Sequence, residues 1–209
     1  MKFKKTYFLP LKKVTVLFII LSVIAVMSFS FKNETKISNA KSDIINKDSV
    51  ESVKAFMDVY KVLMSPRCMN CHPSGDVPLQ GDDSHIHTML PQRGKDGKGV
   101  YAMKCGNCHQ PTNLEGLNKP PGNPNWHLPP ASMKMVFEGR TPGQLAKQLI
   151  NPKTNGNKTL QQLIEHADDG LVKAGWDMGE GRPAPPLSYE EFKKAWITWI
   201  KTGAYPPKQ

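Results

Sequence analysis

The chain reads CMNCH over residues 68–72 and CGNCH over residues 105–109. Each stretch is a Cys-x-x-Cys-His pentapeptide, the attachment signal for c-type haem. Two thiols three residues apart lie on one turn of chain and can form thioether bonds with the two vinyl groups of a haem, while the next His reaches the iron. The sequence therefore predicts two covalently attached haem c groups, with His72 and His109 as proximal iron ligands and with four attachment thiols: Cys68, Cys71, Cys105 and Cys108.

Three other uses of four cysteines compete with this interpretation. A zinc ribbon separates its two Cys-x-x-Cys pairs by about 15–20 residues, whereas 33 residues lie between Cys71 and Cys105. A thioredoxin-like redox pair needs a βαβ context, but Pro and Gly flank these motifs. A disulfide framework suits an oxidising compartment. All three alternatives leave the His after each pair unexplained, which favours haem.

The first 40 residues have the pattern of an export segment. Five lysines stand in residues 1–13, and residues 14–31 contain no charge. A positive stretch before an apolar one is typical of a signal peptide, but 18 uncharged residues also approach the length of a membrane span. We therefore expect residues 1–40 to be either a signal peptide or an uncleaved membrane anchor. The domain over residues 41–209 would then lie in the periplasm or on the outer face of the cytoplasmic membrane.

The formal net charge of +10 comes mostly from this leader, since seven Lys and one Glu in residues 1–40 account for +6. The remaining charge of +4 can steer an acidic redox partner, and it equally fits ordinary solvated lysines. Nothing resembles a basic and aromatic nucleic-acid surface. We therefore expect protein redox partners and no nucleic acid.

Residues 41–209 hold all 16 Gly and 17 of the 18 Pro, so this part is rich in turns. Four amphipathic segments nevertheless predict helices, and no stretch alternates as a strand. The expected fold class is mainly α: a compact, loop-rich dihaem cytochrome c domain. The predicted helices cover residues 48–65, 141–150, 159–169 and 188–202.

Two of these helices carry specific expectations about their buried faces. The first is expected to begin with a capping box of Asp48 and Glu51, with an apolar face that comprises Val50, Val53, Met57, Tyr60 and Met64. The last is expected to bury a stripe that comprises Phe192, Ala195, Trp196, Trp199 and Ile200.

The spacing of 37 residues between the motifs bears on architecture. A complete single-haem domain needs more chain than this to enclose its cofactor. The two haems should therefore share one domain and lie close together, as an electron relay requires.

Sixth iron ligands have to come from the remaining His and Met residues. The helix before Cys68 contains no His, so the loops after each motif are the expected source. We predict that His87, in the loop between the motifs, ligates one iron and that His127, in an aromatic and Pro-rich setting, ligates the other. His85, Met89, Met135, Met178 and His166 are the alternates, although His166 lies at the margin of its predicted helix, where a solvated His is the expected state.

From Cys68 to Pro111 the chain has a haem motif, then Ser-His in a loop, then a second haem motif followed by Gln110 and Pro111. This order resembles that of the small dihaem subunit of periplasmic nitrate reductases. That family also has a distal His before its first haem motif, and no His precedes Cys68 here. The resemblance implies electron transfer, with the first haem's sixth ligand taken from elsewhere.

A closer resemblance, from Cys68 to Pro206, is to bacterial dihaem proteins labelled as isoquinoline 1-oxidoreductase subunits. The matching segments are PLQGDD at 78–83, MKC at 103–105, PGNPNWHL at 121–128 and GR at 181–182. This resemblance implies that the chain accepts electrons from a large exported molybdenum hydroxylase.

Two function classes follow. In the first, both irons are six-coordinate, and the chain relays electrons between a dehydrogenase and a downstream acceptor without being an enzyme by itself. In the second, one iron stays open and the protein is a haem enzyme or binds a small ligand such as peroxide or nitric oxide. The relay is favoured because potential ligands are abundant and no catalytic acid or base stands out.

Overall fold

A helix through residues 47–63 lies at the centre of the helical core in the computed structural model, which describes residues 47–208. Its buried side chains recur every three to four residues, as expected for one face of a helix: Ser52, Ala55, Phe56, Val59, Val62 and Leu63. The predicted face was wrong at Val50 and Met57, which are 65% and 37% exposed, whereas Tyr60 and Met64 are partly buried and pack against the core. The helix also already includes Lys47, so Asp48 is not its N-cap.

The physical reason for this error is a polar residue on the buried face. Ser52 is fully buried, and its hydroxyl donates to the carbonyl oxygen of Trp199 at 3.0 Å. The hydroxyl oxygen of Ser52 in turn accepts from the backbone N–H of Tyr205 at 2.9 Å. Because both of its hydrogen bonds join it to the end of the chain, Ser52 is satisfied in the core, which hydrophobic periodicity alone does not predict.

The remaining elements are short, and most of them are helical. In chain order they are α2 (Pro66–Met69), β1 (Leu79–Gln80), β2 (His85–Ile86), β3 (Gly99–Val100), β4 (Met103–Lys104), η1 (Cys105–Asn107), α3 (Pro142–Ile150), α4 (Leu160–His166), α5 (Gly170–Lys173), η2 (Ala174–Trp176) and α6 (Tyr189–Lys201). The expectation of a mainly helical domain is therefore confirmed.

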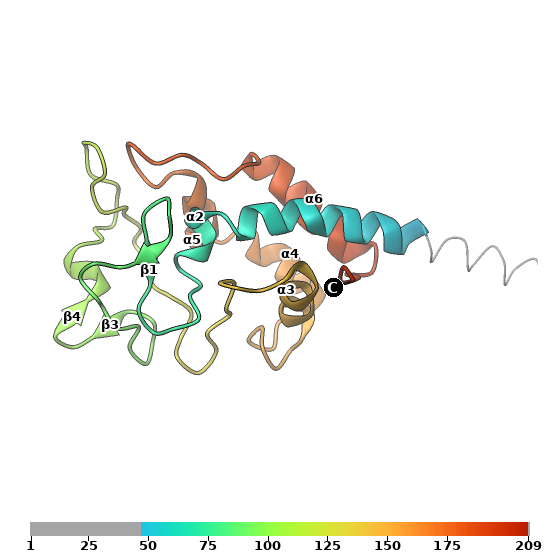
Figure 1. Ribbon diagram of the computed structural model, residues 1–209, viewed down its shortest axis with the longest axis horizontal. Coiled ribbons are helices and arrows are strands. Elements are labelled where there is room, and N and C mark those ends of the chain that lie inside the picture. The colour runs from blue at the N-terminus through green and yellow to red at the C-terminus, as the bar shows by residue number, and fades with distance from the viewer. Residues whose placement is uncertain (1–46, 209) are drawn as a thin grey trace, which may run out of the picture. The chain divides into compact units, whose positions relative to one another are not determined.

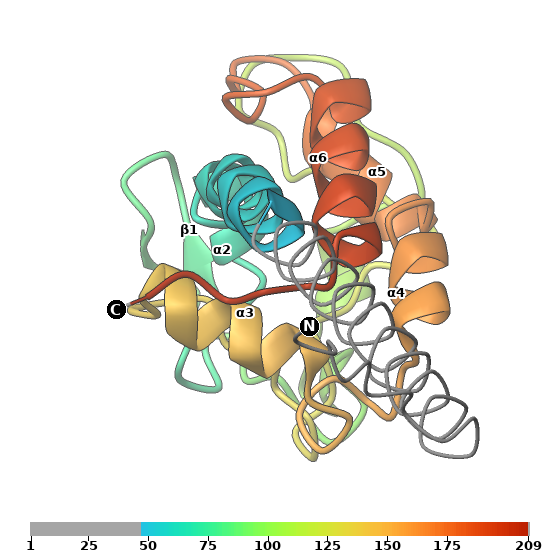
Figure 2. The ribbon, with the colours of Figure 1, turned by 90° about the vertical axis from the view of Figure 1, so that its right-hand side faces the viewer.

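Helix α6 joins the first helix to α4 through aromatic side chains. The rings of Phe56 and Trp199 lie 4.7 Å apart between centroids, and Trp196 Nε1 donates to the carbonyl oxygen of Leu163 at 2.8 Å. The predicted stripe of α6 is confirmed at its four largest members, which are all buried: Phe192, Trp196, Trp199 and Ile200. Figures 1 and 2 show these helices and α3 gathered together, with the hairpins beyond them in Figure 1.

Capping boxes define where three of the helices begin. Thr141 caps α3, Thr159 caps α4 and Ser188 caps α6. In each box the hydroxyl accepts from the N3 backbone N–H, and the N3 side chain accepts from the cap residue's N–H. Helix α3 also has Pro at its first position, where a missing N–H costs nothing. The sequence predicted these starting points.

The segment between residues 70 and 136 is built differently. It contains two antiparallel hairpins, β1–β2 and β3–β4, whose strands are two residues long. Strands this short offer no alternating pattern, so the sequence did not predict them. Few apolar side chains are buried in this segment, namely Pro73, Leu79 and Leu128. Its shape is therefore not set by an apolar core of its own.

The predicted export segment and the boundary at residue 40 lie outside the described residues. From Asp48 onward the chain forms one compact unit. Within residues 47–208, no helix combines the length and the apolar character needed to cross a membrane.

Candidate functional site

Helix α2 and the turn after it present the first motif. Pro66 occupies the first position of α2, and the N–H of Cys71 donates to the carbonyl oxygen of Cys68 at 3.2 Å. The N–H of His72 donates to the carbonyl oxygen of Met69 at 2.9 Å. These turn hydrogen bonds keep the two thiols and the imidazole on one short, ordered stretch, as the spacing of the motif predicted.

The ring of His72 is held on two sides. Its Nδ1 lies 2.8 Å from the carbonyl oxygen of Met135, and because a carbonyl can only accept, Nδ1 carries the proton. The ring also stacks on Phe137, with 3.9 Å between centroids and 9° between planes. Burial lowers the pKa of His72 to about 4. The neutral ring therefore has its free lone pair on Nε2, the atom that would bind a metal.

The second motif has the same arrangement with different partners. Nδ1 of His109 donates to the carbonyl oxygen of Pro121 at 2.8 Å, and its ring stacks on Trp126 at 4.0 Å and 8°. Burial lowers the pKa of His109, while the hydrogen bond to Pro121 opposes this and the nearby His87 adds to it. Here too Nε2 is left as the free ring nitrogen.

A hydrogen bond from the non-ligating ring nitrogen to a carbonyl is the usual support of a metal-binding His, because it fixes the tautomer and the ring plane. This support occurs at both motifs, although the carbonyl lies 63 residues away in one case and 12 in the other. The donor set, two thiols and an oriented imidazole, fits haem c at each motif.

A cavity of about 300 Å³ opens beside the first motif. Its lining includes Cys68, Cys71 and His72, and most other lining residues are apolar, such as Leu163 and Trp196. Burial raises the pKa of Cys68 to about 12 and that of Cys71 to about 11, so both thiols are neutral at pH 7. An apolar cavity walled by two thiols and an oriented imidazole fits the apolar body of a haem.

The two motifs lie near each other. The thiol of Cys105 is close enough to add to the raised pKa of Cys71, which burial chiefly causes. Arg182 likewise contributes to lowering the pKa values of both Arg67, beside the first motif, and His109, in the second. This proximity agrees with the expectation that both sites share one domain.

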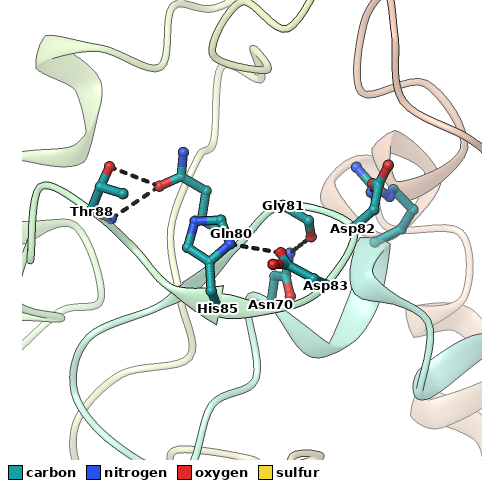
Figure 3. Close-up of polar contacts among 8 residues, drawn as sticks. Asn70, Gln80, Gly81, Asp82, Asp83, His85 and Thr88 are labelled. Carbon is teal, nitrogen blue, oxygen red and sulfur yellow. Dashed lines mark hydrogen bonds and ion pairs between the residues drawn. The ribbon is translucent and has the colours of Figure 1, made fainter.

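Figure 3 shows how the β1–β2 hairpin is fastened to the first motif. Asn70 Nδ2 donates to the carbonyl oxygen of Gly81 at 2.9 Å, and the N–H of Leu79 donates to the carbonyl oxygen of Asn70 at 3.0 Å. The buried guanidinium of Arg67 pairs with the carboxylate of Asp82. These contacts hold the hairpin that leads into the loop carrying His87.

The predicted ligands of this loop differ in their surroundings. His85 is exposed, and its Nδ1 lies 2.6 Å from Asp83 Oδ1 (Figure 3). Met89 is 63% exposed. His87 is half-buried and influences the pKa of His109, which places it near the second motif. The N–H of Met89 donates to His87 Nδ1 at 3.3 Å, so ligation through Nε2 requires the ring proton to move.

The other predicted ligands lie around the cavity. His127, His166 and Met178 all line it. Nδ1 of His127 donates to the carbonyl oxygen of Asn125 at 2.5 Å, which leaves its Nε2 free.

Met135 also lines the cavity, but it supports His72 through its backbone carbonyl. Its sulfur accepts a hydrogen bond from Gln148 Nε2 at 3.2 Å.

Sequence reasoning missed two arginines that shape this region. Arg93 is 1% exposed and donates to the carbonyl oxygens of Pro129 at 2.6 Å and Gly75 at 3.0 Å. It thereby joins the chain after the first motif to the segment that carries His127. Arg67 is 6% exposed, and its Nη2 pairs with the carboxylate of Asp82. Arg93 lies in an irregular loop and Arg67 in the single turn of α2, so neither leaves a periodic signal, although the position of Arg67 directly before Cys68 was a hint.

No family profile, curated protein or solved structure matches this chain. Among the described residues, no three His, Cys, Asp or Glu side chains stand together as a metal cluster. All four thiols are free.

Proposed function

We propose that this chain is an extracytoplasmic electron-transfer protein with two covalently attached haem c groups. The observation that carries the proposal is the matched support of His72 and His109. Each follows a pair of thiols, each donates through Nδ1 to a backbone carbonyl, and each stacks on an aromatic ring. Two independent segments therefore prepare an imidazole Nε2 beside two thiols.

The haems would supply one-electron redox chemistry, and the chain's own residues have three tasks. The four thiols attach the cofactors, and the two histidines ligate the irons. The carbonyls of Met135 and Pro121 raise the basicity of those ligands and hold their planes. The closeness of Cys71 to Cys105 supports rapid transfer between the sites. The domain would thus be a compact dihaem cytochrome c unit.

The proposed donor is a dehydrogenase, and the resemblance named above suggests a large exported molybdenum hydroxylase. Copurification from the native source, followed by identification of the large subunit, tests this. Recovery of the chain with partners that carry no redox cofactor would argue against a relay.

Haem content provides the direct test of the proposed function. Acid-acetone extraction should leave the red colour with the polypeptide, and a pyridine haemochrome assay should give two haems per chain. A value of one haem per chain, or mass spectrometry showing bound zinc with free thiols, would refute the proposal.

Location is proposed from the leader. If the leader is removed, the mature N-terminus should lie near Lys41. If it is retained, the protein should stay with membranes and resist extraction by salt, as expected for an apolar anchor. Full-length, haem-loaded protein in the cytosol contradicts both versions.

One observation favours a second candidate, a small-ligand-binding or catalytic haem. The hydrogen bond from Met89 to His87 Nδ1 keeps the proton on His87 Nε2, an arrangement in which the second iron has no ligand from that ring. Carbon monoxide binding to the reduced wild-type protein tests this. Binding at one iron per chain supports the open site, and no binding supports the relay.

A further inference from the structure

The ring of His72 leaves one place for its iron. Nδ1 is occupied by Met135, and one ring face is covered by Phe137. An iron held by His72 would be bound through Nε2, and the cavity that the first-motif thiols also line would take the haem. A sixth ligand supplied by the protein would come from a nitrogen or sulfur of a side chain that lines the same cavity.

Helix α4 brings one imidazole to this cavity from a regular element. Leu163, His166 and Ala167 all line the cavity, and their spacing of three and four places them on one face of the helix. Leu163 and Ala167 are 2% and 3% exposed, so this face is turned toward the core. His166, the last residue of α4, is itself exposed to solvent, as the sequence predicted, and it borders the cavity at the C-terminal end of this face.

The backbone of α4 is fixed at both ends of this face. The capping box of Thr159 and Gln162 sets where the helix starts. Trp196 Nε1 donates to the carbonyl oxygen of Leu163. The hydroxyl of Tyr189 donates to the carbonyl oxygen of Ala167 at 3.1 Å. A ligand on so constrained an element is placed more accurately than one on an irregular loop.

His72 and His166 line the same cavity, and they come to it from different parts of the chain. His127 lines the same cavity, but it lies on a loop. The residue before it, Trp126, stacks on His109 of the second motif.

We propose that His166 of α4 is the sixth ligand of the first haem iron, opposite His72. This inference rests on the proposed dihaem function and names a different residue from the loop His127 that the sequence favours. Bis-histidine ligation implies a lower reduction potential for this haem than His/Met ligation would give.

Substitution of His166 in the full-length, haem-loaded protein tests the inference. His166→Ala should keep two covalent haems by pyridine haemochrome, change one haem from low-spin to high-spin, and gain about one carbon monoxide site per chain over wild type. Added imidazole should restore the low-spin spectrum. His127→Ala is the matched control from the same cavity, and its spectrum should match wild type.

His166→Met provides a second readout. It should introduce a sulfur-to-iron charge-transfer band at the red end of the oxidised spectrum and raise the potential of one haem. The proposal is overturned if His166→Ala leaves the spectrum unchanged, or if His127→Ala or Met178→Ala produces the high-spin haem instead. A wild-type protein with fewer than two covalent haems would count against the proposed function itself, and the haemochrome assay separates that failure from a wrong ligand.

Discussion

The imidazole of His72 lies parallel to the ring of Phe137, with 3.9 Å between centroids and 9° between planes. Phe137 also donates its backbone N–H to the carbonyl oxygen of His72 at 2.9 Å. The two residues are 65 positions apart and come together at the junction of the helical core and the motif-bearing loops. Phe137 is therefore both a core residue and the support of a proposed iron ligand.

Phe137→Ala should lower the free energy of unfolding by about 3–5 kcal/mol, the usual cost of removing a buried Phe, since this ring is 5% exposed. Denaturant unfolding measures the change. Tyr101→Ala is the control, because that side chain is 97% exposed and its loss should stay within about 0.5 kcal/mol. Equal losses in the two variants would show that Phe137 does not anchor the first site.

Gly122→Ala should disturb the second site. Gly122 directly follows Pro121, whose carbonyl holds His109. A Cβ at position 122 would overlap the backbone of Thr112. We expect less haem at the second motif, measured by haemochrome content and by mass spectrometry of the haem peptides. Gly106→Ala lies inside the second motif in open space and should retain both haems. A fully loaded Gly122→Ala protein with an unchanged spectrum would rule out this close approach as a requirement.

His87→Ala should convert one haem, the second, to a high-spin form that binds carbon monoxide, with both haems still covalently attached. The reason is the proximity of His87 to His109. His85→Ala is the matched control, because His85 lies two residues from His87 and its Nδ1 is hydrogen-bonded to Asp83. The prediction fails if the His87 variant has the wild-type spectrum. A red-end charge-transfer band that disappears in Met135→Ala would instead indicate His/Met ligation.

Ser188→Ala should destabilise the protein by about 1 kcal/mol, because it removes the N-cap hydroxyl of α6. Thermal or denaturant unfolding measures this loss. Thr198→Ala, in the interior of α6, serves as a comparison without a capping role. A loss in Ser188→Ala no larger than in the comparison would contradict the capping interpretation.

The same capping box predicts a pH effect. Hydrogen bonds from the backbone N–H and the hydroxyl of Ser188 lower the pKa of Glu191 from 4.5. A lowered folded-state pKa adds stability above the unfolded value, and this stability is lost as the pH falls through the folded pKa. Glu191→Gln should therefore be less stable than wild type at pH 7, and the difference should fade below about pH 4. A pH-independent difference would assign it to geometry alone.

The sequence predicted those parts of the fold whose causes are local. Capping residues and a spacing of three to four located α3, α4 and α6, and the six motif residues follow from the pentapeptides. The partners of the motif histidines did not follow, because the carbonyl of Met135 and the ring of Phe137 are brought to His72 by tertiary packing. Arg93 was missed for the same reason: its partners, Gly75 and Pro129, lie on separate loops.

The attachment of the β1–β2 hairpin to Asn70 has a consequence for maturation. The proposed export would present the first motif before the second. The hydrogen bonds that join Asn70 to Leu79 and Gly81 lie within residues 70–81, so they need no contact with residues 105–109. We expect assembly to be ordered, with the first site serving as a template for the second, and the isolated second motif to be a poor substrate for the attachment machinery.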